Sequence, residues 1–277
     1  MLRTAMLFGL LTGILLAIGY LFAGIEGMTF FLILAFILNF IAYWYSDRIV
    51  LAIYRAKEIA KDKNPKLHEI VENLAREAGI PKPRVYLINN PTPNAFATGR
   101  SPKHSAIAVT SGLLDSLEWD EIEGVVAHEI AHIKARDTLT STVAATIAGA
   151  IAYIAHIAWY GMLFEDRRRG NILLLPLVIL APLAATLVQL AISRTREFKA
   201  DENGSLFSKK PLSLASALEK ISKFVARNPM RGNAATAHLF IVNPFKADSF
   251  SKLFSTHPPV EERIKRLREL AKKMKIS

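Results

Sequence analysis

Four long apolar segments limit what this 277-residue chain can fold into. They cover residues 5–22, 28–45, 139–163 and 172–192. Each has about the 18 or more residues that a helix needs to cross the hydrocarbon core of a bilayer. A cleaved signal peptide is the alternative for the first segment, but a second apolar segment follows at once, with no small-residue cleavage site before a polar region. The sequence therefore predicts a mainly α membrane protein, with one apolar hairpin at residues 1–46 and another at 139–192.

The composition and charge favour lipid over nucleic acid as a partner. Hydrophobic residues make up 51% of the chain, the mean hydropathy is +0.25 and the formal net charge is +11. Soluble domains are typically about 45–50% apolar. A basic chain can bind nucleic acid, but this one has no nucleic-acid-binding motif, and positive charge also suits an anionic membrane surface. We therefore expect the lipid bilayer, and no nucleic acid, as a partner.

The motif His128-Glu129-Ile130-Ala131-His132 predicts a metal site. Apolar residues recur around it at spacings of three and four, which indicates a helix, and the two histidines share one helix face. Two such imidazoles can bind one Zn²⁺, and Glu129 lies beside them, where it can accept a proton from water. A chance motif on an exposed helix is the alternative, and the apolar flanks argue against it. The chain has no Cys, so His and carboxylate side chains must hold any metal.

A third protein ligand is expected, because a catalytic zinc usually takes three and leaves one position open. A continuation with Gly at 135 and His at 138 is excluded, since the chain has Ala135 and Thr138. The better candidate is Glu197, which is followed four residues later by Asp201 on the same helix face. We expect Glu197 to bind the metal and Asp201 to orient a ligand imidazole. An ordinary ion pair of Glu197 with neighbouring basic residues is the alternative.

Aromatic and basic residues predict the orientation in the membrane. Residues 43–45 read Tyr-Trp-Tyr, an interfacial aromatic belt, and Arg48 and Arg55 follow, whereas the turn at 24–27 has no Lys or Arg. By the positive-inside rule, the N-terminus and the chain after residue 46 lie in the cytoplasm. The expected location is the cell (inner) membrane, which the chain crosses several times, with the metal site facing the cytoplasm.

The second hairpin is inserted between the predicted ligands. Because His132 and Glu197 must meet at one metal, both ends of the 139–192 segment lie on the same side of the membrane. Either both of its apolar segments span or neither does. Three arginines at 167–169 oppose export of the connecting loop. We expect spanning, with shallow insertion or burial in an oligomer as the alternative.

A small sheet is predicted directly before the histidine motif. Three stretches have strand character and are bounded by turn residues: 84–88, 94–99 and 105–110. We expect them to form a small antiparallel β-sheet.

Several motifs, taken together, resemble the HtpX family of membrane zinc metalloproteases, which is related to the CAAX prenyl proteases. Beside the histidine motif, residues 193–201 read S-R-x-R-E-F-x-A-D. Further matching stretches are Pro93–Gly99, Val109–Leu114, Thr256–Pro259 and Glu262–Ile264. They follow in the family's order from about residue 80 to the C-terminus, and the apolar N-terminal hairpin also fits.

The resemblance implies a zincin-like catalytic domain of the gluzincin type, built from residues 47–138 and 193–277 in the cytoplasm. It also implies that His257 lies near the site as a donor to the reacting oxyanion, in preference to His238.

The resemblance further suggests that the strand at 94–99 lies at the edge of the substrate cleft. An exposed edge can bind an extended peptide by backbone pairing. The residues expected to contact substrate are Asn94, Ala95, Phe96 and Ala97. An ordinary sheet strand is the alternative.

Together these features predict a membrane-bound zinc endopeptidase with one Zn²⁺ per chain. The resemblance implies that it cleaves damaged membrane proteins or unfolded polypeptides at the cytoplasmic face, in quality control. A processing protease of the CAAX prenyl type is one alternative, although the chain offers fewer spans than those enzymes need. A non-catalytic membrane scaffold is the other, although every residue expected at the metal is present.

Overall fold

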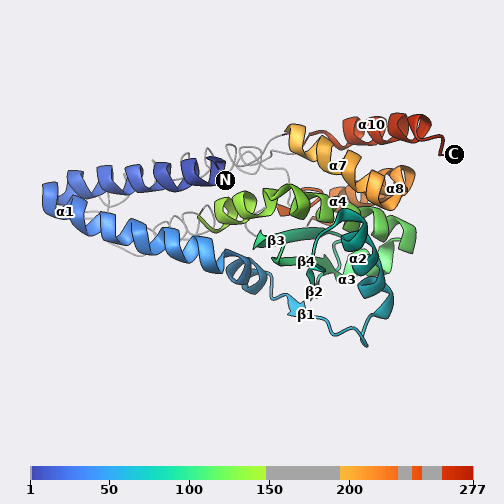
Figure 1. Cartoon of the computed structure of the whole chain (residues 1–277), viewed down its shortest axis with the longest axis horizontal. Coiled ribbons are helices and arrows are strands. Elements are labelled where there is room, and N and C mark those ends of the chain that lie inside the picture. Colours follow the sequence, from blue (N-terminus) through green and yellow to red (C-terminus); the bar gives the residue numbers. More distant parts are fainter. Residues whose placement is uncertain (1, 148–193, 230–238, 245–257, 277) are drawn as a thin grey trace.

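The N-terminal residues form a long apolar helix that bends back on itself. The computed structural model describes residues 2–147, 194–229, 239–244 and 258–276, and helix α1 runs over Leu2–Ile53 (Figure 1). The helix is interrupted at Ala23 and Gly24, where the glycine takes a φ of 58° without strain. Two antiparallel arms result, and Asn39 Nδ2 of the second arm donates to Thr12 Oγ1 of the first at 3.0 Å.

The second arm of α1 is the part that can cross a membrane. Within the described ranges, Ala23–Ile53 is the one helix that is long and apolar enough, and the first arm has a shorter apolar run, Thr4–Ala17. Helix α1 therefore consists of two helical arms with one clear candidate span. Large side chains such as Phe30 and Phe36 are exposed on the second arm, as suits a lipid-facing surface.

The sheet is mixed, so the prediction of a purely antiparallel sheet is wrong. Its strands lie in the order β1-β2-β4-β3, and they are β1 (Lys57–Glu58), β2 (Arg84–Ile88), β3 (Ala95–Ser101) and β4 (His104–Thr110). β3 and β4 form the expected antiparallel hairpin, but β2 and β4 are parallel. The reason is that the chain after β2 places β3 at the outer edge, so that β4 returns between them in the direction of β2. β4 thereby takes a central position, and every residue in it after His104 is buried.

Helix α4 (Trp119–Ala135) carries the histidine motif and lies at the centre of the helical layer (Figure 1). It contacts β3 and three helices: α2 (Pro65–Ala78), α7 (Arg194–Ser208) and α8 (Pro211–Arg227). Helix α3 (Ser111–Ser116) leads from β4 into α4, and α10 (Val260–Lys273) packs on α7 and α8. Because neighbours surround α4, its polar motif is held in a buried setting.

Two glycines let helix backbones approach α4 closely. At Gly204 of α7, a Cβ would lie 2.8 Å from the backbone nitrogen of His128. At Gly124 of α4, a Cβ would lie 2.9 Å from the backbone nitrogen of Leu214 in α8. Such separations are shorter than real Cβ contacts, so α7 and α8 can pack this closely only because no side chain is present.

A further helix begins directly after α4. Arg136 takes a left-handed conformation with a φ of 58°, and residues 137–147 are helical again. Thr138 Oγ1 donates to the carbonyl of Gly99 at 3.0 Å, which ties this helix to the edge strand β3. The segment is the start of the predicted second apolar hairpin. Residues 148–193 lie outside the described residues, and with them most of that hairpin.

We expect Gly204→Ala to lower the free energy of unfolding by about 1–3 kcal/mol, because the added Cβ overpacks the contact between α7 and α4. The neighbouring exposed substitution Asn203→Ala is the control, and it should change stability by less than about 0.5 kcal/mol. Denaturant unfolding of the detergent-solubilised chain, followed by circular dichroism, measures both. Equal stability of the two variants would show that α7 can move away from α4 without cost.

Candidate metal centre

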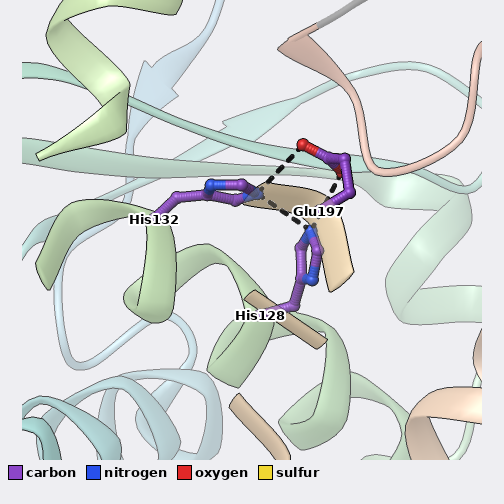
Figure 2. A group of neighbouring side chains, drawn as sticks. All are labelled: His128, His132 and Glu197. Carbon is purple, nitrogen blue, oxygen red and sulfur yellow. Dashed lines mark hydrogen bonds and ion pairs between the residues drawn. The ribbon is translucent and has the colours of Figure 1, made fainter. Parts of the chain in front are cut away.

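Two histidines of α4 and a glutamate of α7 converge on one point (Figure 2). His128 Nε2 lies 3.2 Å from His132 Nε2 and 3.8 Å from Glu197 Oε2. His132 Nε2 lies 3.5 Å from Glu197 Oε1. The structure thus brings together the three side chains that the sequence singles out as metal ligands, with one ligand atom of each within 4.8 Å of the others.

These separations fit a tetrahedral zinc site. Bonds of about 2.0–2.1 Å that meet at tetrahedral angles place two ligand atoms about 3.3–3.4 Å apart. The three contacts, at 3.2, 3.5 and 3.8 Å, lie within about half an ångström of that spacing. Two imidazole nitrogens and one carboxylate are also a donor set of catalytic zinc sites, in which a fourth position stays open.

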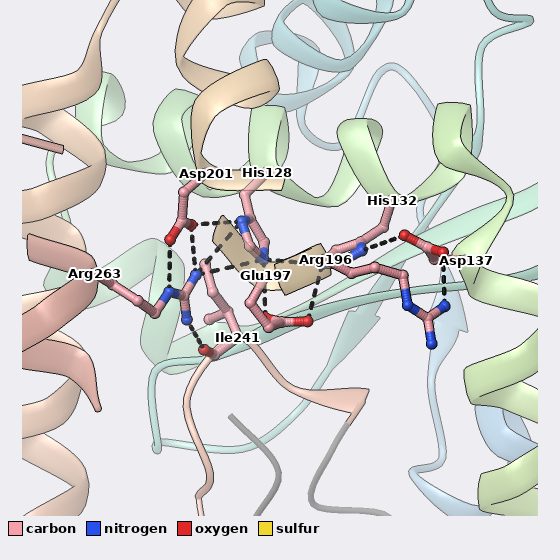
Figure 3. Close-up of polar contacts among 8 residues, drawn as sticks. All are labelled: His128, His132, Asp137, Arg196, Glu197, Asp201, Ile241 and Arg263. Carbon is pink, nitrogen blue, oxygen red and sulfur yellow. Dashed lines mark hydrogen bonds and ion pairs between the residues drawn. The ribbon is translucent and has the colours of Figure 1, made fainter. Parts of the chain in front are cut away.

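A buried ion pair holds the first histidine in place. His128 Nδ1 lies 2.8 Å from Asp201 Oδ1, a contact that places the ring proton on Nδ1 and leaves the Nε2 lone pair for a metal. Arg263 of α10 is fully buried and donates to both carboxylate oxygens of Asp201, at 2.8 Å from Nε and 2.7 Å from Nη2 (Figure 3). The same guanidinium donates from Nη1 to the carbonyl of Ile241 at 2.7 Å. The C-terminal helix therefore takes part in building the site.

The two imidazoles differ in their electrostatics. Burial lowers the pKa of His128 to about 4, although Asp201 opposes the shift, so the ring is neutral at neutral pH. Burial also acts to lower the pKa of His132, but the carboxylates of Glu197 and Asp137 outweigh it and raise that pKa to about 9. A cation bound here would therefore displace a proton from His132.

Glu129 lies against the same point and is not one of the converging ligands. Its side chain is buried, and its carboxylate accepts a hydrogen bond from the backbone N–H of Ala97. Burial raises the pKa of Glu129 to about 7, although the charge of His132 opposes the shift. A carboxyl group that titrates near neutral pH can both accept and return a proton, as a general base must.

The cavity beside these residues is small, with a volume of about 30 Å³. It is lined by Ala97, His128, Glu129, His132, Asp137, Thr138, Ser141, Glu197, Leu239, Phe240 and Ile241. This space holds roughly one or two water molecules. The segment 239–241 therefore closes one side of the site.

The outer strand β3 carries most of the residues that the sequence predicts to bind substrate, and they have different surroundings. Ala97 lines the cavity. The carbonyl of Ala95 accepts a hydrogen bond from the N–H of Ile241 at 3.2 Å, and Asn94, which precedes the strand, donates from Nδ2 to the carbonyl of Val242 at 2.8 Å. The segment 239–242 thus lies along the first part of β3, and Ala97 faces the cavity.

Phe96 alternates with these residues and lies in an aromatic cluster. Its ring centroid is 5.7 Å from that of Tyr54, just past the end of α1, and 5.3 Å from that of Phe240. The cluster connects the end of the apolar helix to the segment that closes the cavity. The predicted oxyanion donor His257, and the alternative His238, lie outside the described residues.

Two residues near the three converging ligands belong to the site but are not predicted from the sequence. Arg263 lies in line with Leu267 and Ala271 on the buried stripe of α10, and a basic residue in an apolar stripe is a signal that can be read from sequence. Asp137 has its Oδ2 3.6 Å from His132 Nδ1, but nothing in the local sequence pattern indicates this contact.

Comparison with known proteins relates most of the chain to one family of peptidases. Residues 61–271 match Peptidase family M48. A protease HtpX homolog of Pyrococcus furiosus is 55% identical over 99% of this chain and 97% of that protein. The homolog of Aquifex aeolicus is 50% identical over 95% of this chain and 90% of that protein. The crystal structure of S. mikatae Ste24p is similar with a TM-score of 0.46 and 19% identity, covering 95% of this chain and 62% of that one. Because the family match spans most of the chain and the HtpX homologs are at least half identical over nearly all of it, the chain belongs to peptidase family M48, among the HtpX proteases, and is a metalloprotease.

Proposed function

We propose that the chain is a zinc-dependent endopeptidase with one Zn²⁺ held by His128, His132 and Glu197. The observation that carries the proposal is the convergence of two imidazole nitrogens 3.2 Å apart with a carboxylate within 3.8 Å of both. The fit to tetrahedral spacing and the lack of any Cys support zinc held by nitrogen and oxygen. Zinc, when bound, supplies a Lewis acid that lowers the pKa of water and polarises a carbonyl.

In this proposal each neighbouring side chain has a separate task. Glu129 takes the proton of the attacking water and returns it to the leaving amine. Asp201 keeps the His128 ring in the orientation that aims Nε2 at the metal, and Arg263 balances the buried charge of Asp201. His257 donates to the oxyanion, a role taken from the family resemblance.

We further propose that the substrate is an extended polypeptide bound at β3 beside Ala97. The strand lies at the outer edge of the sheet, and Ala97 lies both on this strand and in the lining of the cavity. Backbone pairing with an edge strand accepts many sequences. Such tolerance suits a quality-control enzyme that removes damaged membrane proteins or unfolded polypeptides.

We place the zincin-like catalytic domain, residues 47–138 and 193–277, at the cytoplasmic face of the cell membrane. The hairpin at 1–46 would anchor it, and the 139–192 hairpin would add further spans. A contact supports this placement: the guanidinium of Arg100, at the end of β3, lies 4.7 Å from the centre of the Trp44 ring. The end of the strand therefore lies beside the aromatic belt of α1, where a membrane interface is expected.

The metal assignment predicts that Glu197→Ala loses zinc. The purified chain should carry about one zinc. Loss of a residue that only orients a ligand weakens metal binding roughly 10–100-fold, so loss of a ligand itself should weaken it by at least that factor. Glu202→Ala, an exposed carboxylate on the same helix, is the matched control and should keep its zinc. Metal analysis and chelator competition give both values. Full zinc retention by the Glu197 variant would exclude it as a ligand.

The proton-transfer assignment predicts that Glu129→Gln separates binding from chemistry. The amide keeps the shape of the side chain but cannot act as a base, so peptide hydrolysis should fall about 10²–10⁴-fold while zinc content stays unchanged. Glu123→Gln, on the same helix and paired with Lys210, should retain activity. Zinc content and hydrolysis are measured on one preparation. Near-normal cleavage by the Gln variant would mean that another group is the base.

The membrane placement predicts opposite labelling of two engineered cysteines. The chain has no Cys, so each variant carries a single reactive thiol. Lys63→Cys, before α2, should react with an impermeant maleimide only after the cytoplasmic side is opened, whereas Glu26→Cys, beside the bend in α1, should react in intact cells. Both positions are exposed. Labelling of both from the same side would show that the second arm of α1 does not span.

A further inference from the structure

A carboxylate–arginine pair beside the second histidine has no task in the proposed reaction. Asp137 Oδ1 accepts a hydrogen bond from Arg196 Nη1 at 2.7 Å, and Asp137 Oδ2 lies 3.6 Å from His132 Nδ1 (Figure 3). Both side chains are mostly buried, with 16% and 18% of their surface exposed. Taking two charges out of water is costly unless their geometry and neighbours compensate, so a pair in this place calls for a reason.

The pair repeats at His132 the arrangement already present at His128. In each case Nε2 faces Glu197, and a carboxylate lies on the opposite side of the ring, at Nδ1. In each case an arginine holds that carboxylate at 2.7 Å. Yet the two sets come from different elements. Asp201 belongs to α7 and its arginine to α10, whereas Asp137 opens the helix after α4 and its arginine belongs to α7.

The backbone is shaped to make this second contact. In an unbroken helix, a residue five positions after His132 would lie about 140° around the axis and point away from it. Helix α4 ends at Ala135, and Arg136 takes a left-handed conformation that few non-glycine residues adopt. This break turns the chain so that Asp137 faces His132. The left-handed residue caps α4, with its N–H directed at the carbonyls of His132 and Ile133, and it also permits the approach of Asp137 to His132.

We infer that Asp137 is a positioning residue for the metal site, and that Arg196 acts by holding Asp137. The negative charge of the carboxylate lies beside Nδ1 of His132 and holds the ring proton on that nitrogen, which orients the ring and leaves the Nε2 lone pair aimed at the metal. Arg196 directly precedes Glu197, so the same ion pair also fixes the start of the helix that carries the third ligand. The inference rests on the proposed role of His132 as a ligand.

Zinc affinity of the detergent-purified full chain tests the inference. Asp137→Asn keeps the shape of the side chain but removes the charge that attracts both the imidazole proton and Arg196. It should weaken zinc binding about 10–100-fold, the usual cost of losing a partner of a ligand histidine. Arg196→Gln should weaken binding by a smaller factor. The double variant should bind no more weakly than Asp137→Asn alone, because Arg196 acts through Asp137.

The absorption spectrum of the Co²⁺-loaded chain gives a second readout, since it responds to the geometry of the ligands and not to activity. It should shift in Asp137→Asn and stay unchanged in Asp120→Asn. The latter is the matched control, an exposed carboxylate on α4 paired with Lys210 at 2.8 Å. An unshifted cobalt spectrum together with wild-type zinc affinity in Asp137→Asn overturns the inference.

Folding and the proposed function are checked separately. Loss of the ion pair with Arg196 can lower the melting temperature of the metal-free chain, so the loss in Asp137→Asn relative to wild type should be larger with zinc than after chelator treatment. An equal loss with and without zinc would assign Asp137 a purely structural role and overturn the inference. If Asp137→Asn does not fold, the Arg196→Gln variant provides the test. Unchanged zinc affinity in that variant overturns the inference that Arg196 acts on the metal site by holding Asp137. If the wild type itself binds no zinc, or Glu197→Ala keeps it, the proposed function fails. If the wild type binds zinc and Glu197→Ala loses it, but Asp137→Asn binds zinc with wild-type affinity, only the inference fails.

Discussion

The buried contact between Arg263 and Asp201 is the interaction on which the rest of the site depends. Asp201 is needed beside His128, but a carboxylate that is 3% exposed is very unfavourable without a positive partner. Arg263 supplies that partner with two hydrogen bonds, and it is itself fully buried. Removing either residue leaves an uncompensated charge in the interior, whose cost exceeds that of most surface changes.

The same guanidinium joins parts of the chain that are far apart in sequence. It belongs to α10, binds α7 through Asp201 and holds the carbonyl of Ile241 in the segment that closes the cavity. Phe240 of that segment packs edge-on against Tyr54 at 5.0 Å, beyond the last turn of α1. The metal point, the covering segment and the end of the apolar helix are therefore one continuous packed unit, in which a shift of one part is transmitted to the others.

The sequence predicts the local features of the fold and misses the non-local ones. The helix around His128 and His132 follows from the spacing of apolar residues, and the strand positions follow from turn residues on either side of them. Strand order does not follow, because the parallel pairing of β2 with β4 depends on how the chain crosses the sheet rather than on either strand's residues.

The candidate site shows the same division. Glu197 can be proposed from sequence because a catalytic zinc held by two histidines needs a third protein ligand, and Glu197 lies four residues before Asp201 on one helix face. Arg263 leaves a readable trace, a basic residue on a buried helix stripe. The role of Asp137 cannot be predicted from sequence, because its approach to His132 depends on the left-handed conformation of Arg136. Arginine has no preference for that conformation.

The lack of a side chain at Gly204 determines how closely α7, which carries Glu197, approaches α4, which carries His128 and His132. A Cβ there would lie 2.8 Å from the backbone of His128, whereas ordinary contacts begin near 3.4 Å, so any larger residue would push α7 away by about half an ångström. Metal–ligand bonds vary by only about 0.2 Å. Even the methyl group of alanine at position 204 would therefore displace α7, and with it Glu197, by more than the range of metal–ligand bond lengths. The hydrogen atom of Gly204 thus sets the distance between α7, which carries Glu197, and α4, which carries the two histidines.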